Sequence, residues 1–303
     1  MQRRDVSRRE FLRTTVGGAT AAALAVQPAF GENAAPKRTA TDLVSLGKTG
    51  YKICRLGIGT GSNAGEVQRD LGQEGFTKLI REAYDRGVTF IDTADMYKTH
   101  TMVGKAIKGL PRENLWIQTK MRWEPQFIKE GTQKCLDRFR KELDTDYVDS
   151  LLIHCTTQNS WVDDLKFMQD IIGAAKEKGV VRTQGISCHG LPALRAATKN
   201  DWIDVHLCRV NPQGRHVDGL TGRWSEPGKP DQAFPEIRAM HQKGRGVIAM
   251  KIIGNGDFKK PEDRERSFLF AMNCEFVDAI VVGVKSTAEI DEAIERMNRA
   301  LVS

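Results

Sequence analysis

Eight short apolar runs, each followed by a helix-length segment, recur through most of the 303-residue chain. Strands that are apolar along their whole length are typical of a parallel sheet covered on both faces. The runs that we predict as strands are residues 55–59, 88–92, 115–119, 148–153, 181–187, 203–207, 247–250 and 279–282. This alternation predicts an α/β protein built around a parallel sheet.

Helical periodicity fills the intervals between these runs. The predicted helices are residues 74–86, 100–107, 127–143, 163–178, 192–199, 234–243, 261–272 and 288–301. An open, doubly wound sheet would have the same order, but the Gly-x-Gly-x-x-Gly turn that often follows its first strand is missing from this sequence. Eight strands without that turn favour a closed (β/α)8 TIM barrel over residues 42–303.

A short hairpin is predicted ahead of the barrel, over residues 42–54. Its turn is the Gly47-Lys48-Thr49-Gly50 segment, which separates two short runs of strand-forming residues. We expect the hairpin to cap the N-terminal end of the barrel. Active sites of such barrels lie at the opposite end, where strands pass into the loops that follow them.

The first residues of the chain resemble a twin-arginine export signal. The segment Ser7-Arg8-Arg9-Glu10-Phe11-Leu12-Arg13 precedes a run of small apolar residues, 16–26. We therefore predict a signal peptide over residues 1–31 and a polar linker over residues 32–41. The resemblance implies that the twin-arginine translocation machinery is a partner, that the location is periplasmic or extracytoplasmic, and that no stable membrane anchor remains. A disordered basic tail is the alternative.

The net charge of +7 is inflated by this leader, since residues 1–31 hold five arginines against one aspartate and one glutamate. The remaining chain carries 41 basic and 37 acidic residues. No basic stretch is interleaved with aromatic residues, so the sequence does not indicate a nucleic-acid partner. The six cysteines form no metal-ligand spacing, and we predict buried free thiols and no metal site.

Four polar residues stand at or just after the ends of three predicted strands. Asp92, Lys120 and His154 each follow an apolar run, and Tyr97 comes five residues after Asp92. Alternation along each strand places the three strand-end side chains on inward faces, provided that these faces point into the barrel. We expect all four to meet at one barrel mouth.

Together these residues form a proton donor with the means to tune it. A tyrosine hydroxyl has an ordinary pKa of about 10, and a neighbouring ammonium lowers that pKa by stabilising the phenolate. Asp92 would hold Lys120 by an ion pair, and His154 would hydrogen-bond a substrate carbonyl. A metal-dependent hydrolase using His154, His189 and His206 with Asp92 is an alternative, but it would place the Lys120 ammonium beside the metal.

These motifs resemble those of the aldo-keto reductases. The segments that carry the resemblance are Asp92-Thr93-Ala94-Asp95-Met96-Tyr97, Thr119-Lys120 and Leu152-Ile153-His154. The likeness extends from Leu43 to about Asn298. It implies NAD(P)H-dependent reduction of a small aldehyde or ketone, with Tyr97 as proton donor and Asp92, Lys120 and His154 completing the tetrad.

The resemblance also implies a binding site for NADP or NAD, although the cofactor motifs depart from the family pattern. Candidate cofactor residues are Ser187, Cys188, His206, Lys251, Gly254, Gly283, Lys285 and Glu292. Glu289 stands where NADP-specific members carry an arginine, and its carboxylate would repel a 2′-phosphate. Lys285 would supply a cation, so the choice between the two nucleotides stays open.

Thr60 and Trp123 are the residues that we expect to contact the substrate. The Gly-, Pro- and Arg-rich residues 210–233 are too long for a simple βα loop and are placed where a substrate lid would be. The departures in the cofactor motifs leave a second functional class open. In it the barrel is a dinucleotide-binding sensor or partner subunit with weak or no catalysis.

Overall fold

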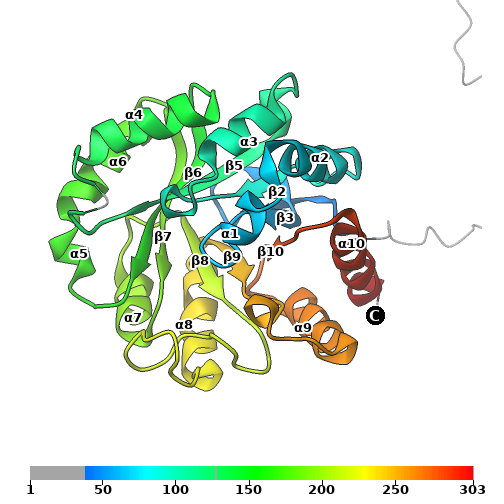
Figure 1. The fold of residues 1–303 in the computed structure, drawn as a ribbon. Helices are drawn as coiled ribbons and strands as arrows, with labels where there is room; N and C mark the ends of the chain where they lie inside the picture. The colour runs from blue at the N-terminus through cyan, green and yellow to red at the C-terminus, as the bar shows by residue number, and fades with distance from the viewer. Residues whose placement is uncertain (1–37, 127, 303) are drawn as a thin grey trace, which may run out of the picture. The chain divides into compact units, whose positions relative to one another are not determined.

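The computed structural model describes residues 38–126 and 128–302. Eight parallel strands close into a barrel in the order β10-β3-β4-β5-β6-β7-β8-β9, which confirms the predicted (β/α)8 TIM barrel (Figure 1). The barrel strands are β3 (Leu56–Gly59), β4 (Phe90–Asp92), β5 (Trp116–Arg122), β6 (Val148–Thr156), β7 (Val181–Cys188), β8 (Val205–Arg209), β9 (Gly246–Met250) and β10 (Ala279–Gly283).

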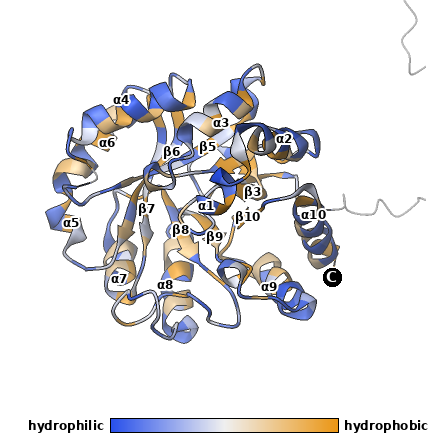
Figure 2. Ribbon diagram, viewed as in Figure 1, coloured by the Kyte–Doolittle hydropathy of each residue, from blue (hydrophilic) through white to orange (hydrophobic). Residues whose placement is uncertain are grey.

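Helices surround the barrel, and Figure 2 shows their polar faces outward and the apolar strands at the centre. The α-helices are α1 (Glu66–Arg69), α2 (Gly72–Asp85), α3 (His100–Ile107), α4 (Thr132–Leu143), α5 (Trp161–Asp164), α6 (Lys166–Glu177), α7 (Leu191–Lys199), α8 (Pro230–Gln242), α9 (Pro261–Asn273) and α10 (Thr287–Val302). Three single-turn 3-10 helices are η1 (Asp95–Tyr97), η2 (Arg112–Asn114) and η3 (Gly254–Gly256).

The spacing of apolar residues explains how the helices dock. In α2, Phe76, Leu79, Ile80 and Ala83 are buried, and their spacing of three and four residues makes one continuous stripe. Burial of a large apolar side chain such as Phe76 contributes about 1.5 to 3 kcal/mol. This stripe is the buried face of α2.

The predicted hairpin is confirmed as β1 (Leu43–Ser45) paired antiparallel with β2 (Lys52–Cys54). Its turn donates two backbone hydrogen bonds, from Gly47 to the Asp278 carboxylate and from Lys48 to the Gly244 carbonyl. Both acceptors lie just before barrel strands. The hairpin therefore covers the N-terminal end of the barrel, as expected.

Several element boundaries differ from the prediction. Helix α4 begins at Thr132 and not at residue 127, which lies outside the described residues. The helix predicted over residues 163–178 is two helices, α5 and α6, which meet at Leu165. The four-residue α1 and the three 3-10 helices were not predicted, because such short segments carry too little periodicity to be read.

The predicted signal peptide and most of the predicted linker lie outside the described residues, and both stay predictions. Residues 38–41 pack on the barrel: Ala40 is buried, and its backbone N–H donates to Asn298 Oδ1 over 2.8 Å. Among the described residues, none of the helices has the length and apolar character needed to cross a membrane.

Candidate active site

A buried ion pair stands at the mouth of the barrel. The Lys120 ammonium at the end of β5 lies 2.7 Å and 2.8 Å from the two oxygens of Asp92, which ends β4. It also donates to the Thr93 carbonyl over 2.8 Å. Gln118 Nε2 donates to Asp92 Oδ1, also over 2.8 Å. Each charged group is therefore satisfied, as burial of an ion pair requires.

Tyr97 lies beside this ion pair, on η1, with the centre of its ring 4.9 Å from Lys120 Nζ. Its position depends on the first βα loop. A Cβ at Gly61 would lie 2.5 Å from Cε2 and Cζ of the Tyr97 ring, and one at Gly65 would lie 2.4 Å from the Tyr97 carbonyl oxygen. Glycine at both positions lets the tyrosine approach the barrel axis.

His154 completes the group from β6, where it pairs in register with Arg122 of β5. It is buried, and its ring meets that of Tyr97 edge to face with centres 5.6 Å apart. No described residue hydrogen-bonds its Nδ1. The four predicted catalytic residues are thus brought together, as alternation along the strands indicated.

The pKa values at this site are governed mainly by burial. Burial raises the pKa of Tyr97 well above its ordinary value, and the Asp92 carboxylate raises it further. The net shift is therefore upward, and not downward as predicted from the nearby Lys120 ammonium. Burial also lowers the pKa of Lys120, which Asp92 opposes, and lowers the pKa of His154 well below its usual range. Tyr97 is therefore protonated and His154 neutral at neutral pH.

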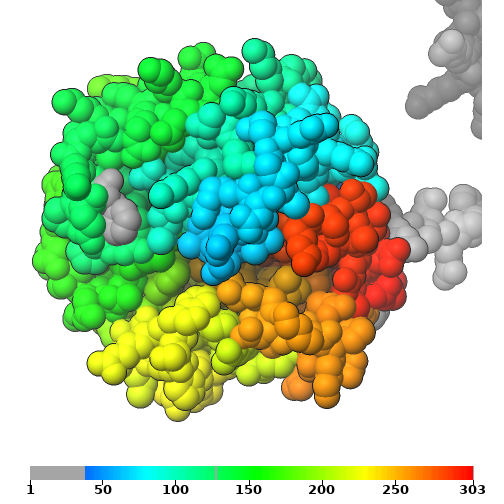
Figure 3. Space-filling view, in the orientation of Figure 1, coloured from blue at the N-terminus to red at the C-terminus, as the bar shows by residue number. Residues whose placement is uncertain are grey.

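A cavity of about 630 Å³ opens beside these residues. Its walls come from residues within 59–67 after β3, 250–259 after β9 and 281–293 up to α10, and Asp92 and Tyr97 reach it. Figure 3 shows the same face hollowed between the blue segment after β3, the orange segment of α9 and the red segment of α10. A volume of this size lies within the range of small-molecule sites.

Comparison with known proteins identifies the family. The sequence model described as "Aldo/keto reductase family" matches residues 55–273. The chain belongs to this family. Methylglyoxal reductase DkgB of Salmonella typhi is 36% identical over 145 residues, covering 46% of this chain and 54% of the relative. L-galactose dehydrogenase of Arabidopsis thaliana is 31% identical over 227 residues, covering 72% of this chain and 67% of the relative.

The first of these matches spans only about half the length of the relative, whereas the fold similarity extends further. A solved aldo-keto reductase of Bacillus halodurans superposes with a TM-score of 0.66 at 18% identity, covering 85% of this chain and 94% of that one. At this identity the likeness shows the fold alone.

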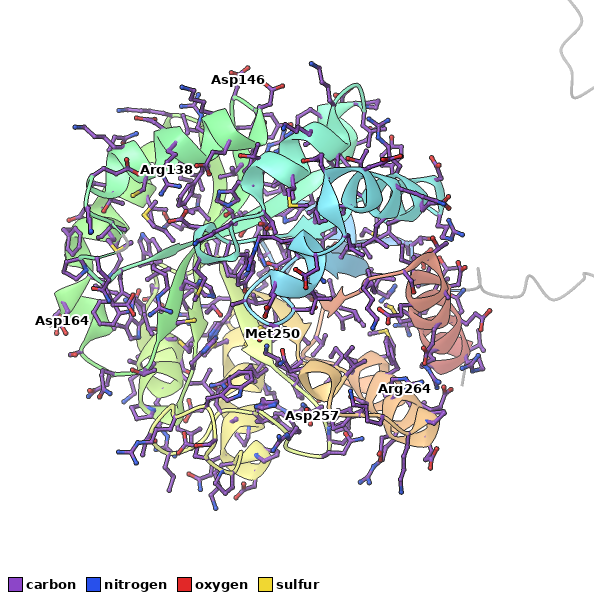
Figure 4. All side chains as sticks on the ribbon, viewed as in Figure 1. Arg138, Asp146, Asp164, Met250, Asp257 and Arg264 are labelled. Atoms are coloured by element: carbon purple, nitrogen blue, oxygen red, sulfur yellow. The ribbon has the colours of Figure 1, made fainter. Side chains whose placement is uncertain are left out.

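The cavity of this aldo-keto reductase fits an anionic dinucleotide. Four of the predicted cofactor residues line it, namely Lys251, Gly283, Lys285 and Glu292. Lys259 and Arg264 line it as well, so that several cationic side chains face the same space. In Figure 4, Met250 lies near the barrel axis and Arg264 out on α9, which marks the extent of the wall.

Lys251 directly follows β9 and is one of the cations of this wall. Its ammonium donates to Asn255 Oδ1 over 2.9 Å and lies 5.0 Å from the centre of the Trp224 ring. Burial, helped by the charge of Arg209, lowers the pKa of Lys251 to about 8. No carboxylate of the described chain pairs with it. An anionic ligand would therefore meet an ammonium that has no carboxylate partner.

The start of α10 brings both signs of charge to the other end of the cavity. Glu289 lines the wall, and its carboxylate accepts the Lys285 backbone N–H over 2.8 Å. Glu292 is bound by Arg264 over 2.7 Å and by Arg296 over 2.8 Å. The Glu292 charge is thus largely balanced by two arginines. Glu289 is therefore the carboxylate that would repel a 2′-phosphate.

Three predicted cofactor residues lie elsewhere. His206 is buried against Met240 of α8, so it faces the helix layer, and the prediction that it binds cofactor is wrong. This placement also excludes the three-histidine metal alternative. Cys188 is buried and accepts a hydrogen bond from Thr156 Oγ1. Ser187 is buried beside His154 in register, and its Oγ has no partner in residues 38–126 and 128–302.

Gly254, Thr60 and Trp123 also do not line the cavity. Gly254 is in a left-handed conformation, φ 56°, and a Cβ there would lie 2.8 Å from Phe258, so its role is in the backbone turn. Thr60 is fully buried, with its hydroxyl 2.9 Å from that of Thr99, which removes it from substrate contact. Trp123 is half-buried, with no hydrogen-bond partner for its indole nitrogen within the described chain.

The loop after β8 is anchored to the barrel. Arg209 and Asp218, both buried, form an ion pair of 2.7 Å, and Asp218 also accepts the Gly190 backbone N–H. Residues 230–233, counted as loop in the prediction, begin α8. The role of this loop as a lid stays a prediction.

Sequence reasoning missed the wall supplied by the loop after β3. Ser62 and Asn63 line the cavity, and Gln68 Nε2 ties this loop to the Val284 carbonyl over 3.0 Å. The signal was present in the glycines of Gly57-Ile58-Gly59-Thr60-Gly61, since closely spaced glycines at a strand end allow a backbone or ring to approach.

Proposed function

We propose that this aldo-keto reductase uses NADH or NADPH to reduce a small aldehyde or ketone to the alcohol, with Tyr97 as the proton donor. The observation that carries the proposal is the buried Lys120–Asp92 ion pair beside the Tyr97 ring, at the wall of a cationic cavity. The names of the relatives, a methylglyoxal reductase and an L-galactose dehydrogenase, support a small carbonyl or sugar substrate. The proposal covers both nucleotides, because Glu289 and Lys285 line the same end of the cavity.

In this mechanism the protein supplies a proton and a sheltered site. A reduced nicotinamide, when bound, provides the hydride for the carbonyl carbon. The Tyr97 hydroxyl, kept protonated by its raised pKa, donates its proton to the carbonyl oxygen. The Lys120 ammonium then stabilises the resulting phenolate, and Asp92 keeps that ammonium charged and in place. Neutral His154 hydrogen-bonds the carbonyl and orients it.

Turnover by the purified chain tests this function directly. We expect oxidation of NADH or NADPH when a panel of small aldehydes and ketones is added, followed by absorbance of the reduced nicotinamide. Formation of the alcohol in equal amount confirms that the carbonyl is the acceptor. Tight binding of the dinucleotide without its oxidation in the presence of any carbonyl of the panel would instead support the sensor or partner-subunit alternative.

The affinity for dinucleotide is expected to depend on pH through Lys251. Its pKa of about 8 means that the ammonium is present below that pH and lost above it. Since the ammonium attracts phosphate, the dissociation constant should rise about tenfold, or about 1.4 kcal/mol, as the lysine loses its proton. The bound anion raises the pKa of Lys251, so in the complex the lysine loses its proton at a higher pH than in the free protein.

Fluorescence titration of NADH and NADPH across this pH range measures the effect. The matched control is Lys251→Met, which should bind more weakly at low pH and show a flat profile. A pH profile that is the same in Lys251→Met and in the native chain would exclude Lys251 as the titrating group.

A further inference from the structure

Arg138 lies on α4, outside the group of residues that face the cavity, yet it binds the element that carries Tyr97. We propose that Arg138 is a positioning residue, which fixes the Tyr97 hydroxyl by holding η1 against α4. The inference rests on the proposed role of Tyr97 and adds a residue to which no catalytic part has been given. Figure 4 labels Arg138 on the outer ring of helices.

The contact with η1 is a two-point ion pair. Arg138 Nη1 donates to Asp95 Oδ1 over 2.8 Å, and Nη2 donates to Asp95 Oδ2 over 3.1 Å. This planar geometry restrains both the distance and the orientation of the carboxylate. Asp95 is the first residue of η1 and Tyr97 is the last, so the pair fixes one end of a single turn.

Few other contacts hold that turn. A 3-10 turn has weak internal hydrogen bonds, and η1 has the bonds from Tyr97 N to Ala94 O and from Lys98 N to Asp95 O, with no side-chain cap at its start. Arg122 Nη1 also lies 3.7 Å from Met96 Sδ, in the middle of the turn. Lys98, directly after it, is left-handed with φ 55°. On the side of α1, Arg69 donates to the Tyr97 carbonyl. Arg69 and Arg138 therefore hold the turn from opposite ends, and Arg138 links it to α4.

The far side of Arg138 is itself restrained. Its Nε donates to Glu130 over 2.7 Å, and its Nη1 lies 3.2 Å from Glu142. Glu142 Oε2 also lies 3.0 Å from His100 Nδ1, and His100 Nε2 lies 2.7 Å from Thr119 Oγ1. Thr119 precedes Lys120 on β5, so the network connects both partners of the Tyr97–Lys120 contact.

The same network explains why a cluster with metal-ligand spacing needs no metal. The ligand atoms of Asp95, His100 and Glu142 lie within 4.8 Å of one another. The guanidinium of Arg138 bonds both carboxylates and already supplies a cation. Asp95 raises the pKa of Arg138 further, so this positive charge persists at any ordinary pH.

Substitution of Arg138 tests whether this residue positions Tyr97 without contributing to dinucleotide binding. In Arg138→Met we expect kcat to fall about 10- to 100-fold, because a displacement of about 1 Å at a reacting group can cost that much. The dissociation constant for NADH or NADPH should change less than about twofold. Arg138→Lys, which restores a charge but not two-point contact, should recover part of kcat. The matched control is Arg140→Met on the same helix, which pairs with Asp137 and does not contact η1.

A second readout observes Tyr97 without turnover. The chain has four tyrosines, so fluorotyrosine labelling gives few NMR signals, and the Tyr97→Phe variant assigns that of Tyr97. We expect this signal to shift or broaden in Arg138→Met and in Asp95→Asn, and to stay unchanged in Arg140→Met. The double variant Asp95→Asn with Arg138→Met should lose little more kcat than either single variant, because both substitutions remove the same Arg138–Asp95 contact.

The outcomes distinguish this inference from the proposed function. An unchanged Tyr97 signal and a native kcat in Arg138→Met would overturn the positioning role while the reductase function stood. A native chain without turnover would overturn the function, and a displaced Tyr97 signal in Arg138→Met would still establish that Arg138 positions the tyrosine.

Discussion

Tyr97→Phe is expected to lower kcat for carbonyl reduction by about 10²- to 10⁴-fold, the usual contribution of a positioned acid. The substitution removes only the hydroxyl. The phenyl ring keeps its contact with Gly61 and its edge-to-face packing with His154. The dissociation constant for dinucleotide should therefore stay within a few-fold of the native value. Steady-state kinetics and fluorescence titration on the same preparation give both numbers.

The pH dependence of the reduction rate is a second test of the Tyr97 hydroxyl, because the direction of the change can be predicted. Because burial and Asp92 raise the pKa of Tyr97, the hydroxyl remains protonated through neutral pH. With saturating dinucleotide, kcat for reduction should fall as the pH rises through that raised pKa, and this fall should be absent from the residual activity of Tyr97→Phe. Tyr84→Phe on α2 is the control and should match the native chain. Native turnover in Tyr97→Phe would remove Tyr97 from the mechanism.

The tetrad could be predicted because a parallel barrel places strand ends close together. Asp92 ends β4, and Lys120 and His154 lie toward the ends of β5 and β6, so alternation along neighbouring strands decides which side chains meet. No loop conformation had to be known for these three. Tyr97 was placed by its distance from Asp92 in the family motif, and its actual support, from Gly61 and Arg69, lies in a loop whose course the sequence does not specify.

The cofactor residues were harder to predict for a related reason. A shift of one residue along a strand turns a side chain to the opposite face. His206 illustrates this, since it contacts Met240 in the helix layer. Thr60 is buried and its hydroxyl lies 2.9 Å from that of Thr99, a neighbour that no spacing rule identifies. Conversely, the Arg138 network joins residues 43 positions apart in the sequence and becomes visible only in the folded chain.

The pKa of Tyr97 differs in direction from the sequence-based expectation because burial outweighs the effect of the nearby ammonium. A neighbouring ammonium does favour the phenolate, but burial disfavours any charged form and is the largest influence here. In the proposed mechanism, the Lys120 ammonium would therefore act mainly after Tyr97 has given up its proton. It would stabilise the phenolate, which is rare before the reaction.

Lys120→Met should have two effects that can be separated. Loss of the ammonium removes the stabilisation of the phenolate and should lower kcat by about 10²-fold or more. It also leaves the Asp92 carboxylate buried without its charged partner, which should lower the free energy of unfolding by about 3 to 5 kcal/mol. Denaturant unfolding and steady-state kinetics measure the two losses. Lys166→Met, which breaks the exposed pair with Asp170, is the control and should change neither appreciably.

A double variant, Asp92→Asn with Lys120→Met, separates the effect of Lys120 on the free energy of unfolding from its effect on turnover. With both charges gone, most of the free energy of unfolding should return, because no unpaired charge is buried, while turnover should stay low. In Lys120→Met alone, the Asp92 carboxylate stays buried without the cation that balances it, so this variant should be less stable than the double variant. Turnover that returns with stability in the double variant would show that Lys120 acts only in packing and would leave Tyr97 without its stabilising partner.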